Sequence, residues 1–283
     1  MSSPPPAPPP CYGLIAGNGR FPFLVLQAAR SRGVEMVVVA IKEETDPAIA
    51  AHTRSLHWLS LGQLGKLIEV LHAEGVTRAV MAGQVKHKQI FSAIRPDWKM
   101  VKVLASLASK NTDSLLGAVV RTLEAEGIQF ESSTTFLEPL LAPEGRFSRR
   151  RATVTEAGDI EYGLQVARHL AAVDIGQAVV VADRACVAVE AMEGTDAMIR
   201  RAATLVQGRS LTVVKVAKPN QDLRFDVPVV GPGTIAAMRE SGATALAVES
   251  GLTLLLDRAT LIADADAADI ALVGVARPTL APS

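Results

Sequence analysis

The chain has 283 residues, 49% of them hydrophobic, and its 29 basic residues balance 29 acidic ones. This length is enough for one large domain or two of ordinary size. The lack of a long basic run and the 4% aromatic content argue against a nucleic-acid surface. Two cysteines do not form a disulfide framework, and they fit a reducing cytoplasm.

The N-terminus reads MSSPPPAPPP, which lacks the basic start and the apolar stretch of a signal peptide. We predict that residues 1–11 form a disordered, proline-rich tail. No uninterrupted run of about 18 apolar residues occurs, so no transmembrane helix is expected. A lipid substrate stays open, because a protein without a membrane span can still take lipid from a membrane surface.

Residues 12–137 alternate predicted strands with predicted helices. A short apolar run leads into the glycine-rich turn GNGRFP, and helical periodicity then runs from Pro22 to about Arg32. Further strands are predicted at 34–41, 56–61, 76–83 and 128–133, and further helices at 61–75, 97–109 and 113–127. This alternation predicts an α/β domain, with a parallel sheet and helices on both faces.

The pattern lapses over 138–152, EPLLAPEGRFSRRRA, where we place a linker. Residues 153–283 then form the second predicted domain. Its helices are predicted at 156–173, 195–206 and 233–242, and its strands as a pair within 177–194 and at 211–218, 223–230, 245–250, 252–257 and 270–276. This order indicates a mixed α/β, or α+β, domain with antiparallel pairs.

The turn Gly17-Asn18-Gly19 lies between a strand and a helix. Backbone N–H groups in such a turn and at a helix N-terminus attract anions, which favours a bound nucleotide. A tight turn without a ligand is the alternative. The third glycine of G-x-G-x-x-G is replaced by Pro22, which argues against an NAD fingerprint.

The segment AGQVKHKQIF (82–91) follows the fourth predicted strand. Ligands of open parallel sheets sit beyond the carboxyl ends of the strands. Gly83, Gln84 and Lys86 therefore join the first turn as candidate nucleotide-binding residues.

The segment CVAVEAMEGTDAMIRRA (186–202) leads from a strand into a helix. Helix capping explains Thr195 and Asp196, but it leaves Glu190 and Glu193 unexplained. A threonine hydroxyl and the N–H groups of a helix start also suit a phosphate, which makes Gly194 and Thr195 candidate substrate-binding residues.

The stretch VKVAKPNQDLRFDVPVVGPGT (213–233) holds five charged residues between apolar runs. In extended form, Asp222, Arg224 and Asp226 share one face, with the two carboxylates about 13 Å apart at most. A surface ion-pair strip is one interpretation. The other is Mg²⁺ chemistry on a phosphate ester, because Mg²⁺ takes one or two carboxylates plus phosphates and water.

On the second interpretation, Asp222, Asp226 and Lys218 are the candidate catalytic residues. The candidate Mg²⁺ ligands are Asp222 and Asp226, with Glu193 or Glu190. Lys215 and Arg224 join the substrate-binding set, since cations offset phosphoryl charge. The sequence contains no zinc-ligand spacing, no G-x-S-x-G motif and no P-loop.

Five segments together resemble the LpxI family, the UDP-2,3-diacylglucosamine pyrophosphatases of lipid A biosynthesis. They are GLIAGNGRFP, MAGQVKHK, DIGQAVVV, ACVAVEAMEGTDAMIRRA and KVAKPNQDLRFDVPVVGPGT. The resemblance extends from Tyr12 to Val275. It implies a Rossmann-like N-terminal domain that binds the uridine nucleotide, and a C-terminal domain of uncommon fold that holds the acylated sugar.

The resemblance also implies a cytoplasmic hydrolase that uses Mg²⁺. Its products would be 2,3-diacylglucosamine 1-phosphate (lipid X) and UMP, with Asp226 as the critical carboxylate and Asp222 as its partner. Two other hypotheses stay open, a nucleotide-binding sensor without turnover and an NAD-dependent enzyme. A homodimer and a peripheral contact with the inner-membrane surface are both compatible with the sequence.

Overall fold

The computed structural model describes residues 11–85, 96–107, 112–206 and 208–278. Lys86 and residues 1–10 of the predicted tail lie outside these ranges. The chain divides into two compact units. Unit 1 comprises Met1–Leu137 together with Asp222–Asp226, and unit 2 comprises Glu138–Gln221 and Val227–Ser283. The predicted linker at 138–152 falls in unit 2, and the predicted strand at 223–230 is divided between the units.

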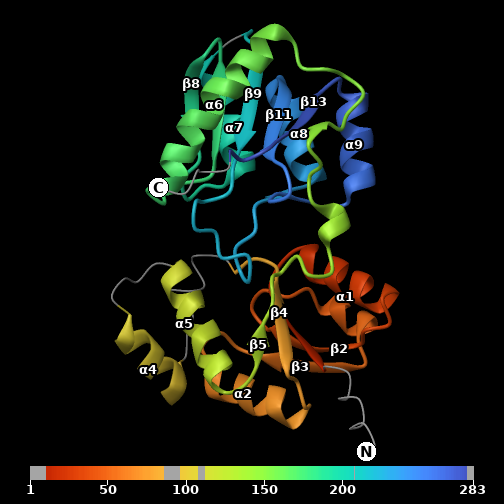
Figure 1. Ribbon diagram of the computed structural model, residues 1–283, viewed down its shortest axis with the longest axis vertical. Helices are drawn as coiled ribbons and strands as arrows, with labels where there is room; N and C mark the ends of the chain where they lie inside the picture. The colour runs from red at the N-terminus through yellow and green to blue at the C-terminus, as the bar shows by residue number, and fades with distance from the viewer. Residues whose placement is uncertain (1–10, 86–95, 108–111, 207, 279–283) are drawn as a thin grey trace, which may run out of the picture. The chain divides into compact units, whose positions relative to one another are not determined.

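Unit 1 is built around a parallel sheet with the strand order β3-β2-β1-β4-β5 (Figure 1). Its described elements are β1 (Tyr12–Ala16), α1 (Phe21–Ser31), β2 (Met36–Ile41), η1 (Pro47–His52), β3 (Ser55–Leu59), α2 (Leu64–Ala73), β4 (Arg78–Ala82), α4 (Trp98–Ser106), α5 (Thr112–Ala125) and β5 (Gln129–Phe130). Every described pairing in this sheet is parallel. The order reverses direction between β1 and β4, so a topological switch point lies between these two strands.

Helices cover both faces of the unit 1 sheet. One core joins α2, α4 and α5 to strand residues such as Ile15, Val39 and Ala79. Leu14 and Val38 alternate with that set and are fully buried on the other face. Figure 1 shows the strands with α1 on one side and α2, α4 and α5 on the other.

Unit 2 contains a mixed sheet with the strand order β6-β13-β11-β9-β7-β8 and a short parallel pair, β10-β12. Its described elements are η2 (Glu138–Leu140), β6 (Gly145–Arg146), α6 (Val154–Ala172), β7 (Ala178–Ala182), β8 (Ala185–Val189), α7 (Thr195–Leu205), β9 (Leu211–Lys215), β10 (Val229–Val230), α8 (Pro232–Ser241), β11 (Ala243–Glu249), β12 (Leu254–Leu255), α9 (Arg258–Ala267) and β13 (Ala271–Val275). Strands β9, β11 and β13 are parallel, whereas β6, β7 and β8 pair antiparallel. The two units together confirm the predicted α/β and mixed α/β fold class.

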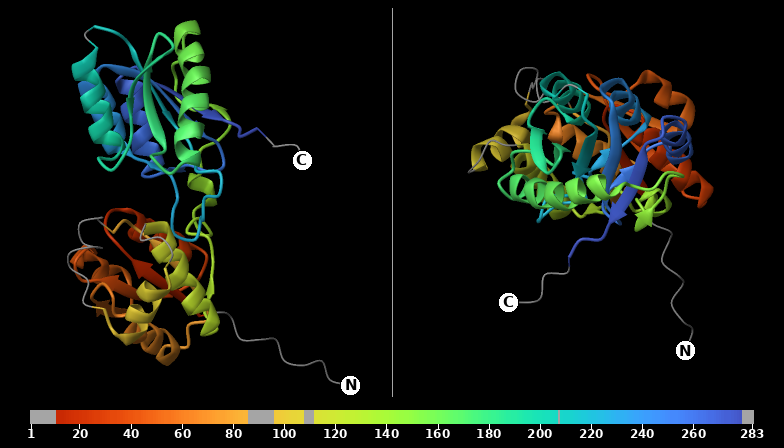
Figure 2. Two further views of the ribbon diagram at one scale, coloured as in Figure 1. Left: turned by 90° about the vertical axis from the view of Figure 1, so that its left-hand side faces the viewer. Right: turned by 90° about the horizontal axis from the view of Figure 1, so that it is seen from above.

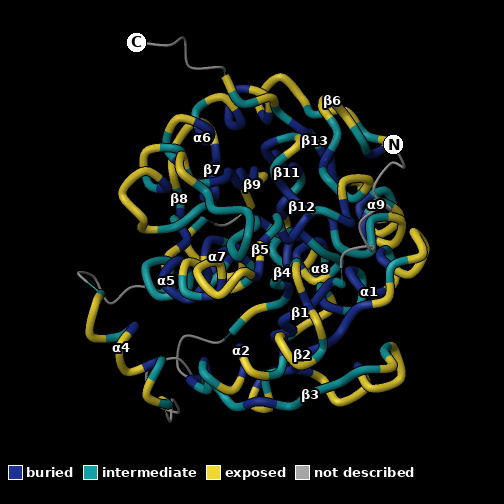
Figure 3. Tube along the Cα trace, turned by 60° about the horizontal axis from the view of Figure 1, so that its bottom comes forward, coloured by how far each residue is buried: buried dark blue, intermediate teal, exposed yellow. Residues whose placement is uncertain are grey.

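Alternating residues of β7 face two separate cores. Val179 and Val181 pack against α6, while Val180 packs against α7, α8 and α9. Figure 2 shows α6 on one side of this sheet and the other helices of unit 2 on the opposite side. The central strands of each sheet are accordingly drawn as buried in Figure 3.

The predicted strand over 223–230 is wrong for most of its length, since only Val229–Val230 form a strand. Residues 223–225 make a turn in which the Asp226 N–H donates to the Asp222 carbonyl at 3.0 Å. The Asp222 carboxylate also accepts the Arg224 N–H at 3.1 Å. Such local hydrogen bonds compete with a strand ladder. Asp222, Arg224 and Asp226 therefore do not share the face of a strand.

Within the residues that the structure describes, no helix is long and apolar enough to cross a membrane.

Candidate functional site

The two predicted nucleotide-binding loops lie side by side at the carboxyl edge of the unit 1 sheet. Gly17–Gly19 follow β1, and Gly83 and Gln84 follow β4, its neighbour in the sheet. The loops pair as an isolated antiparallel bridge between Asn18 and Gln84. They flank the switch point, which is where open α/β sheets bind ligands.

Several backbone N–H groups of these loops already have backbone partners. Gly17 donates to Ala82 at 2.8 Å, Asn18 donates to Gln84 at 2.8 Å, and Gln84 donates to Asn18 at 3.1 Å. These three N–H groups join the loops together rather than facing an anion. An anion at this edge would instead approach Gly19 and the start of α1, where the N-cap Arg20 makes no side-chain cap.

Close packing of the two loops explains two of their glycines. A Cβ on Gly17 would lie 2.9 Å from the Gln84 carbonyl oxygen, and one on Gly83 would lie 2.7 Å from the Asn18 oxygen. Around Gly19, by contrast, nothing lies within 4 Å of such an atom. Gly17 and Gly83 thus permit loop packing, while Gly19 borders open space.

A third loop supports the same edge. The Asn18 side-chain amide donates to the buried Glu44, which follows β2, at 3.3 Å. The buried Thr45 hydroxyl donates to the Ala16 carbonyl at the end of β1 at 2.6 Å. Asn18 is therefore held on both sides, by the loops after β2 and β4.

The carboxylate-rich turn Asp222–Asp226 is seated on unit 1, although the chain on either side belongs to unit 2. The Ser133 N–H donates to the Leu223 carbonyl at 2.8 Å, and the Ser133 hydroxyl donates to the Arg224 carbonyl at 2.9 Å. Phe225 packs against the core that contains α5. Arg224 adds an ion pair with Glu124 of α5 at 2.8 Å.

This seat places the turn at the edge that carries the predicted nucleotide-binding loops. Ser133 lies just beyond β5, and β5 runs parallel to β4, so the chain leaves both strands toward the same edge. Neighbouring strands are about 4.8 Å apart, which puts β5 about 10 Å from β1. The structure therefore brings Asp222 and Asp226 to the loop edge of the unit 1 sheet.

Asp222 is held by the guanidinium of Arg224. The Arg224 Nε and Nη2 atoms donate to the two carboxylate oxygens at 2.9 and 2.7 Å. These bonds lower the pKa of Asp222 below its usual range, against the opposing effect of burial. The same pairing raises the pKa of Arg224. Both groups are therefore charged at neutral pH.

Unit 2 gathers three polar residues at the carboxyl end of β9. Lys215 ends that strand, Thr195 begins α7, and Glu190 follows β8. The Lys215 ammonium donates to the Thr195 hydroxyl at 2.8 Å, and that hydroxyl donates to Glu190 at 2.7 Å. All three are at most 9% exposed. Thr195 thus links a buried cation to a buried anion.

Three other predicted site residues lie near this cluster in the sequence, namely Glu193, Gly194 and Lys218. Gly194 is the N-cap of α7 and has a φ of 84°, a value that favours glycine. Glu193 pairs with Arg201 at 2.6 Å, and Lys218 pairs with Asp174 at 2.7 Å. Glu193 is therefore paired with an arginine of α7.

Comparison with known proteins gives two family matches that together span most of the chain. The LpxI N-terminal domain matches residues 11–140, and the LpxI C-terminal domain matches residues 143–273. The chain belongs to the LpxI family. A curated relative, the UDP-2,3-diacylglucosamine pyrophosphatase LpxI of Caulobacter vibrioides, is 34% identical over 273 residues, which cover 93% of this chain and 96% of the relative.

Two of the solved structures that resemble this chain are only weakly similar to it. CobK precorrin-6A reductase is 12% identical, with 96% of this chain and 90% of the reductase covered and a TM-score of 0.30. The biotin carboxylase domain of the Hydrogenobacter thermophilus 2-oxoglutarate carboxylase is 10% identical, with 71% and 43% covered and a TM-score of 0.27. Neither likeness carries an argument about this protein.

The three predicted magnesium ligands, Asp222, Asp226 and Glu193, would need oxygens of the substrate to complete a magnesium site. No three His, Cys, Asp or Glu side chains gather as metal ligands within the part of the chain that the structure describes. Mg²⁺ needs no such cage, because it usually binds one or two carboxylates, substrate phosphates and water. Of the three predicted ligands, Asp222 and Glu193 have arginine partners, and Asp226 also has an interaction within the chain.

Sequence reasoning missed the residues that hold the candidate site in place. In unit 1 these are Ser133 and Glu124, which anchor the Asp222–Asp226 turn. In unit 2 they include Glu249, whose side chain is 0% exposed. Its place at the end of the apolar run ALAVE was the one available signal, since a carboxylate is rarely buried without a partner.

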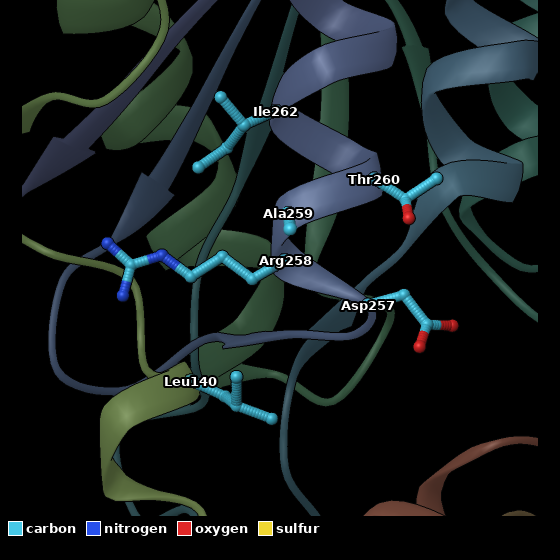
Figure 4. Close-up of a pocket in the computed structure, with 6 residues that line it drawn as sticks. All are labelled: Leu140, Asp257, Arg258, Ala259, Thr260 and Ile262. Carbon is cyan, nitrogen blue, oxygen red and sulfur yellow. The ribbon is translucent and has the colours of Figure 1, made fainter.

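A surface hollow of about 500 Å³ lies at the start of α9 in unit 2. Figure 4 shows that Leu140, Asp257 and Arg258 line it, with Ala259, Thr260 and Ile262. None of these is a predicted site residue. The Arg258 side chain donates to the Pro139 carbonyl at 2.9 Å, which ties α9 to the η2 segment beside the hollow.

Proposed function

We propose that this protein hydrolyses the diphosphate bond of UDP-2,3-diacylglucosamine, releasing UMP and 2,3-diacylglucosamine 1-phosphate. The relative from Caulobacter vibrioides bears the name of this activity. The seating of the Asp222–Asp226 turn beside the loops after β1 and β4 is the observation that carries the proposal. It joins candidate catalytic carboxylates to a candidate nucleotide edge within one unit.

In the proposed reaction, the loop edge of unit 1 binds the uridine nucleotide. Gly19 and the first turn of α1 face the phosphates, because their N–H groups and the helix dipole favour an anion. Asp226 orients the attacking water, and Arg224 holds Asp222 as an anion beside it.

Magnesium would be held by Asp226 and by oxygens of the diphosphate. When bound, it would stabilise the charge on the phosphoryl oxygens and lower the pKa of a water molecule. Arg224 neutralises the neighbouring carboxylate of Asp222, so Asp222 acts by positioning in this proposal.

The first test is release of UMP from UDP-2,3-diacylglucosamine by the purified protein. We expect hydrolysis that EDTA removes and Mg²⁺ restores, and Asp226→Asn should lower kcat by at least about 100-fold. Asp183→Asn is the matched control, because Asp183 is an exposed turn residue paired with Arg209. Full activity of Asp226→Asn would refute the assignment of this carboxylate.

A nucleotide sensor without turnover is the second candidate. The linked ion pairs of Asp222, Arg224 and Glu124 favour the sensor. They explain the charges of Asp222 and Arg224 without any catalysis. Single-turnover assays with protein in excess separate the two candidates. Nucleotide binding without UMP release over hours would support the sensor.

A further inference from the structure

The carboxylate of Glu249 lies at the end of β11 in unit 2 and is completely shielded from solvent. Its Oε1 atom accepts the Arg168 Nε–H at 3.1 Å. Its Oε2 atom accepts Arg277 Nη2 at 2.8 Å and the Ala217 N–H at 3.0 Å. Burying a carboxylate between two arginines carries a large desolvation penalty, so core stability alone is a poor reason for it.

Arg277 also reaches the backbone that leaves β9. Its Nη2 atom donates to the Ala217 carbonyl, and to the Lys218 carbonyl at 3.3 Å. Glu249 thus accepts the Ala217 N–H, while Arg277 donates to the carbonyls of Ala217 and Lys218. We call Glu249, Arg277 and the backbone of Ala217 and Lys218 the clamp. Arg168 pairs with the same carboxylate, but among the described residues its hydrogen bonds do not reach this backbone.

The clamp lies where the chain leaves unit 2 for the Asp222–Asp226 turn. Ala217 and Lys218 come just before Gln221, the last residue of unit 2 ahead of that turn. On the return side, the Leu254 N–H donates to the Pro228 carbonyl at 2.8 Å, and β10 then pairs with β12. The segment from Pro219 to Val227 is thus fixed to unit 2 at both of its ends.

We propose that Glu249 and Arg277 are positioning residues for the Asp222–Asp226 turn. They touch no reacting group. They hold the root of the segment that carries Lys218, Asp222 and Asp226, so that a loosened root misplaces these side chains. Misplacement of a catalytic group by about 1 Å can cost about 100-fold in rate. The kinetic consequence depends on the proposed hydrolysis, whereas the anchoring itself does not.

The test compares Arg277→Lys with Arg168→Lys. Each lysine keeps the positive charge beside Glu249, but Arg277→Lys loses the planar fork that joins Glu249 to the two carbonyls. We expect kcat to fall about 10- to 100-fold in Arg277→Lys, with KM within about threefold of the wild-type value. In Arg168→Lys we expect kcat within about twofold. Equal losses of kcat in both variants, or none in Arg277→Lys, would overturn the proposal.

Amide hydrogen exchange tests the anchoring without any reaction. Peptides covering 216–226 should exchange faster in Arg277→Lys than in the wild type or in Arg168→Lys, while peptides from β7 stay unchanged. An inactive wild-type protein would refute the proposed function and leave this readout intact. Unchanged exchange over 216–226 would refute the clamp.

Arg277→Gln is the second variant, should Arg277→Lys not fold. It keeps an amide NH₂ group that can donate to the carbonyls and removes the charge, and we expect the same local increase in exchange. If neither Arg277 variant folds while Arg168→Lys does, the clamp serves folding, and the positioning role is refuted.

Discussion

Glu156 shows how single residues keep a buried carboxylate charged in this protein. It is 4% exposed and stands in the first turn of α6. It accepts the Thr153 N–H at 2.7 Å in a capping box, both terminal nitrogens of Arg150 at 3.0 and 2.7 Å, and the Thr244 hydroxyl at 2.6 Å. Burial raises the pKa of Glu156, but the hydrogen bonds from Arg150, Thr244 and Thr153 together lower it below the usual value.

The lowered pKa makes the contribution of Glu156 depend on pH. A carboxyl whose pKa is lower in the folded state stabilises the protein at pH values above its pKa in the unfolded chain, about 4.5. This stabilisation is lost as the pH falls through the pKa of the folded state. We expect Glu156→Gln to lower the free energy of unfolding by about 3 kcal/mol at pH 7. The difference from the wild type should shrink below about pH 4.

Urea denaturation at several pH values measures this difference. The exposed Glu35, which pairs with Arg30 at 3.6 Å, supplies the control Glu35→Gln. It should change the free energy of unfolding by no more than about 0.5 kcal/mol at either pH. A Glu156→Gln difference that is the same at pH 3 and pH 7 would contradict the assignment.

At the scale of elements, the loops after β1 and β4 act as one interlocked unit. Their pairing through Asn18 and Gln84 requires Gly83, whose φ is 96° and whose Cβ position is filled by the Asn18 carbonyl. Backbone packing thus accounts for a glycine that the sequence also marks as a ligand-binding candidate. The structural role and the predicted binding role coincide because both loops begin at the switch point.

We expect Gly83→Ala to lower the free energy of unfolding by more than about 2 kcal/mol, because it adds a steric clash to backbone strain. Gly33→Ala is the control, since Gly33 has a φ of 75° and nothing within 4 Å of its Cβ position. It should cost about 1 kcal/mol, from strain alone. Chemical denaturation of both variants measures the difference, and equal costs would show that the loops are not tightly packed.

At the scale of the whole molecule, residues from the second half of the chain complete unit 1. Phe225 joins the core of unit 1, while the residues on either side of Asp222–Asp226 belong to unit 2. Side chains far apart in sequence, such as Glu124 and Arg224, therefore meet within one unit. Such contacts attach the candidate catalytic turn to unit 1, although the chain segments on either side of the turn belong to unit 2.

Phe225→Ala tests this tie. We expect it to lower the free energy of unfolding by about 2–4 kcal/mol, and to lower kcat about tenfold or more because Asp226 is its neighbour. Phe147→Ala is matched in size and burial, since Phe147 of unit 2 is also half-buried and packs against a hydrophobic core. It should cost similar stability with little change in kcat. A similar loss of kcat in both variants would show that the effect is general destabilisation.

Local signals in the sequence were sufficient to predict the helices, strands and turns that have clear periodicity or turn residues. The β-branched run at 34–41 became β2. The pair of strands predicted within 177–194 became β7 and β8, joined by a turn with positive φ at Asp183 and Arg184. The helix predicted at 233–242 corresponds to α8, which ends at Gly242 in the left-handed conformation. Each of these depends on neighbours in the chain, which is why composition and spacing could predict it.

The predicted strand through Asp222 and Asp226 failed for an equally physical reason. Alternation of polar and apolar residues suggested a strand, but the hydrogen bonds of Asp222 with Arg224 and the docking on Ser133 fold the segment into a turn. Ser133 carried no local signal of its role, and Glu249 carried only its place at the end of an apolar run, because both act on partners about 30 to 90 residues away.

The sequence by itself determined the α/β class, the glycine-rich loops at strand ends and the charged residues proposed for chemistry, because turn preference, periodicity and residue type are local properties. Only the tertiary structure decided which unit holds the Asp222–Asp226 turn, which glycines serve packing, and which arginines hold Asp222 and Glu249. Those outcomes depend on hydrogen bonds and ion pairs between residues distant in the chain. Their geometry exists only after the sheets have formed.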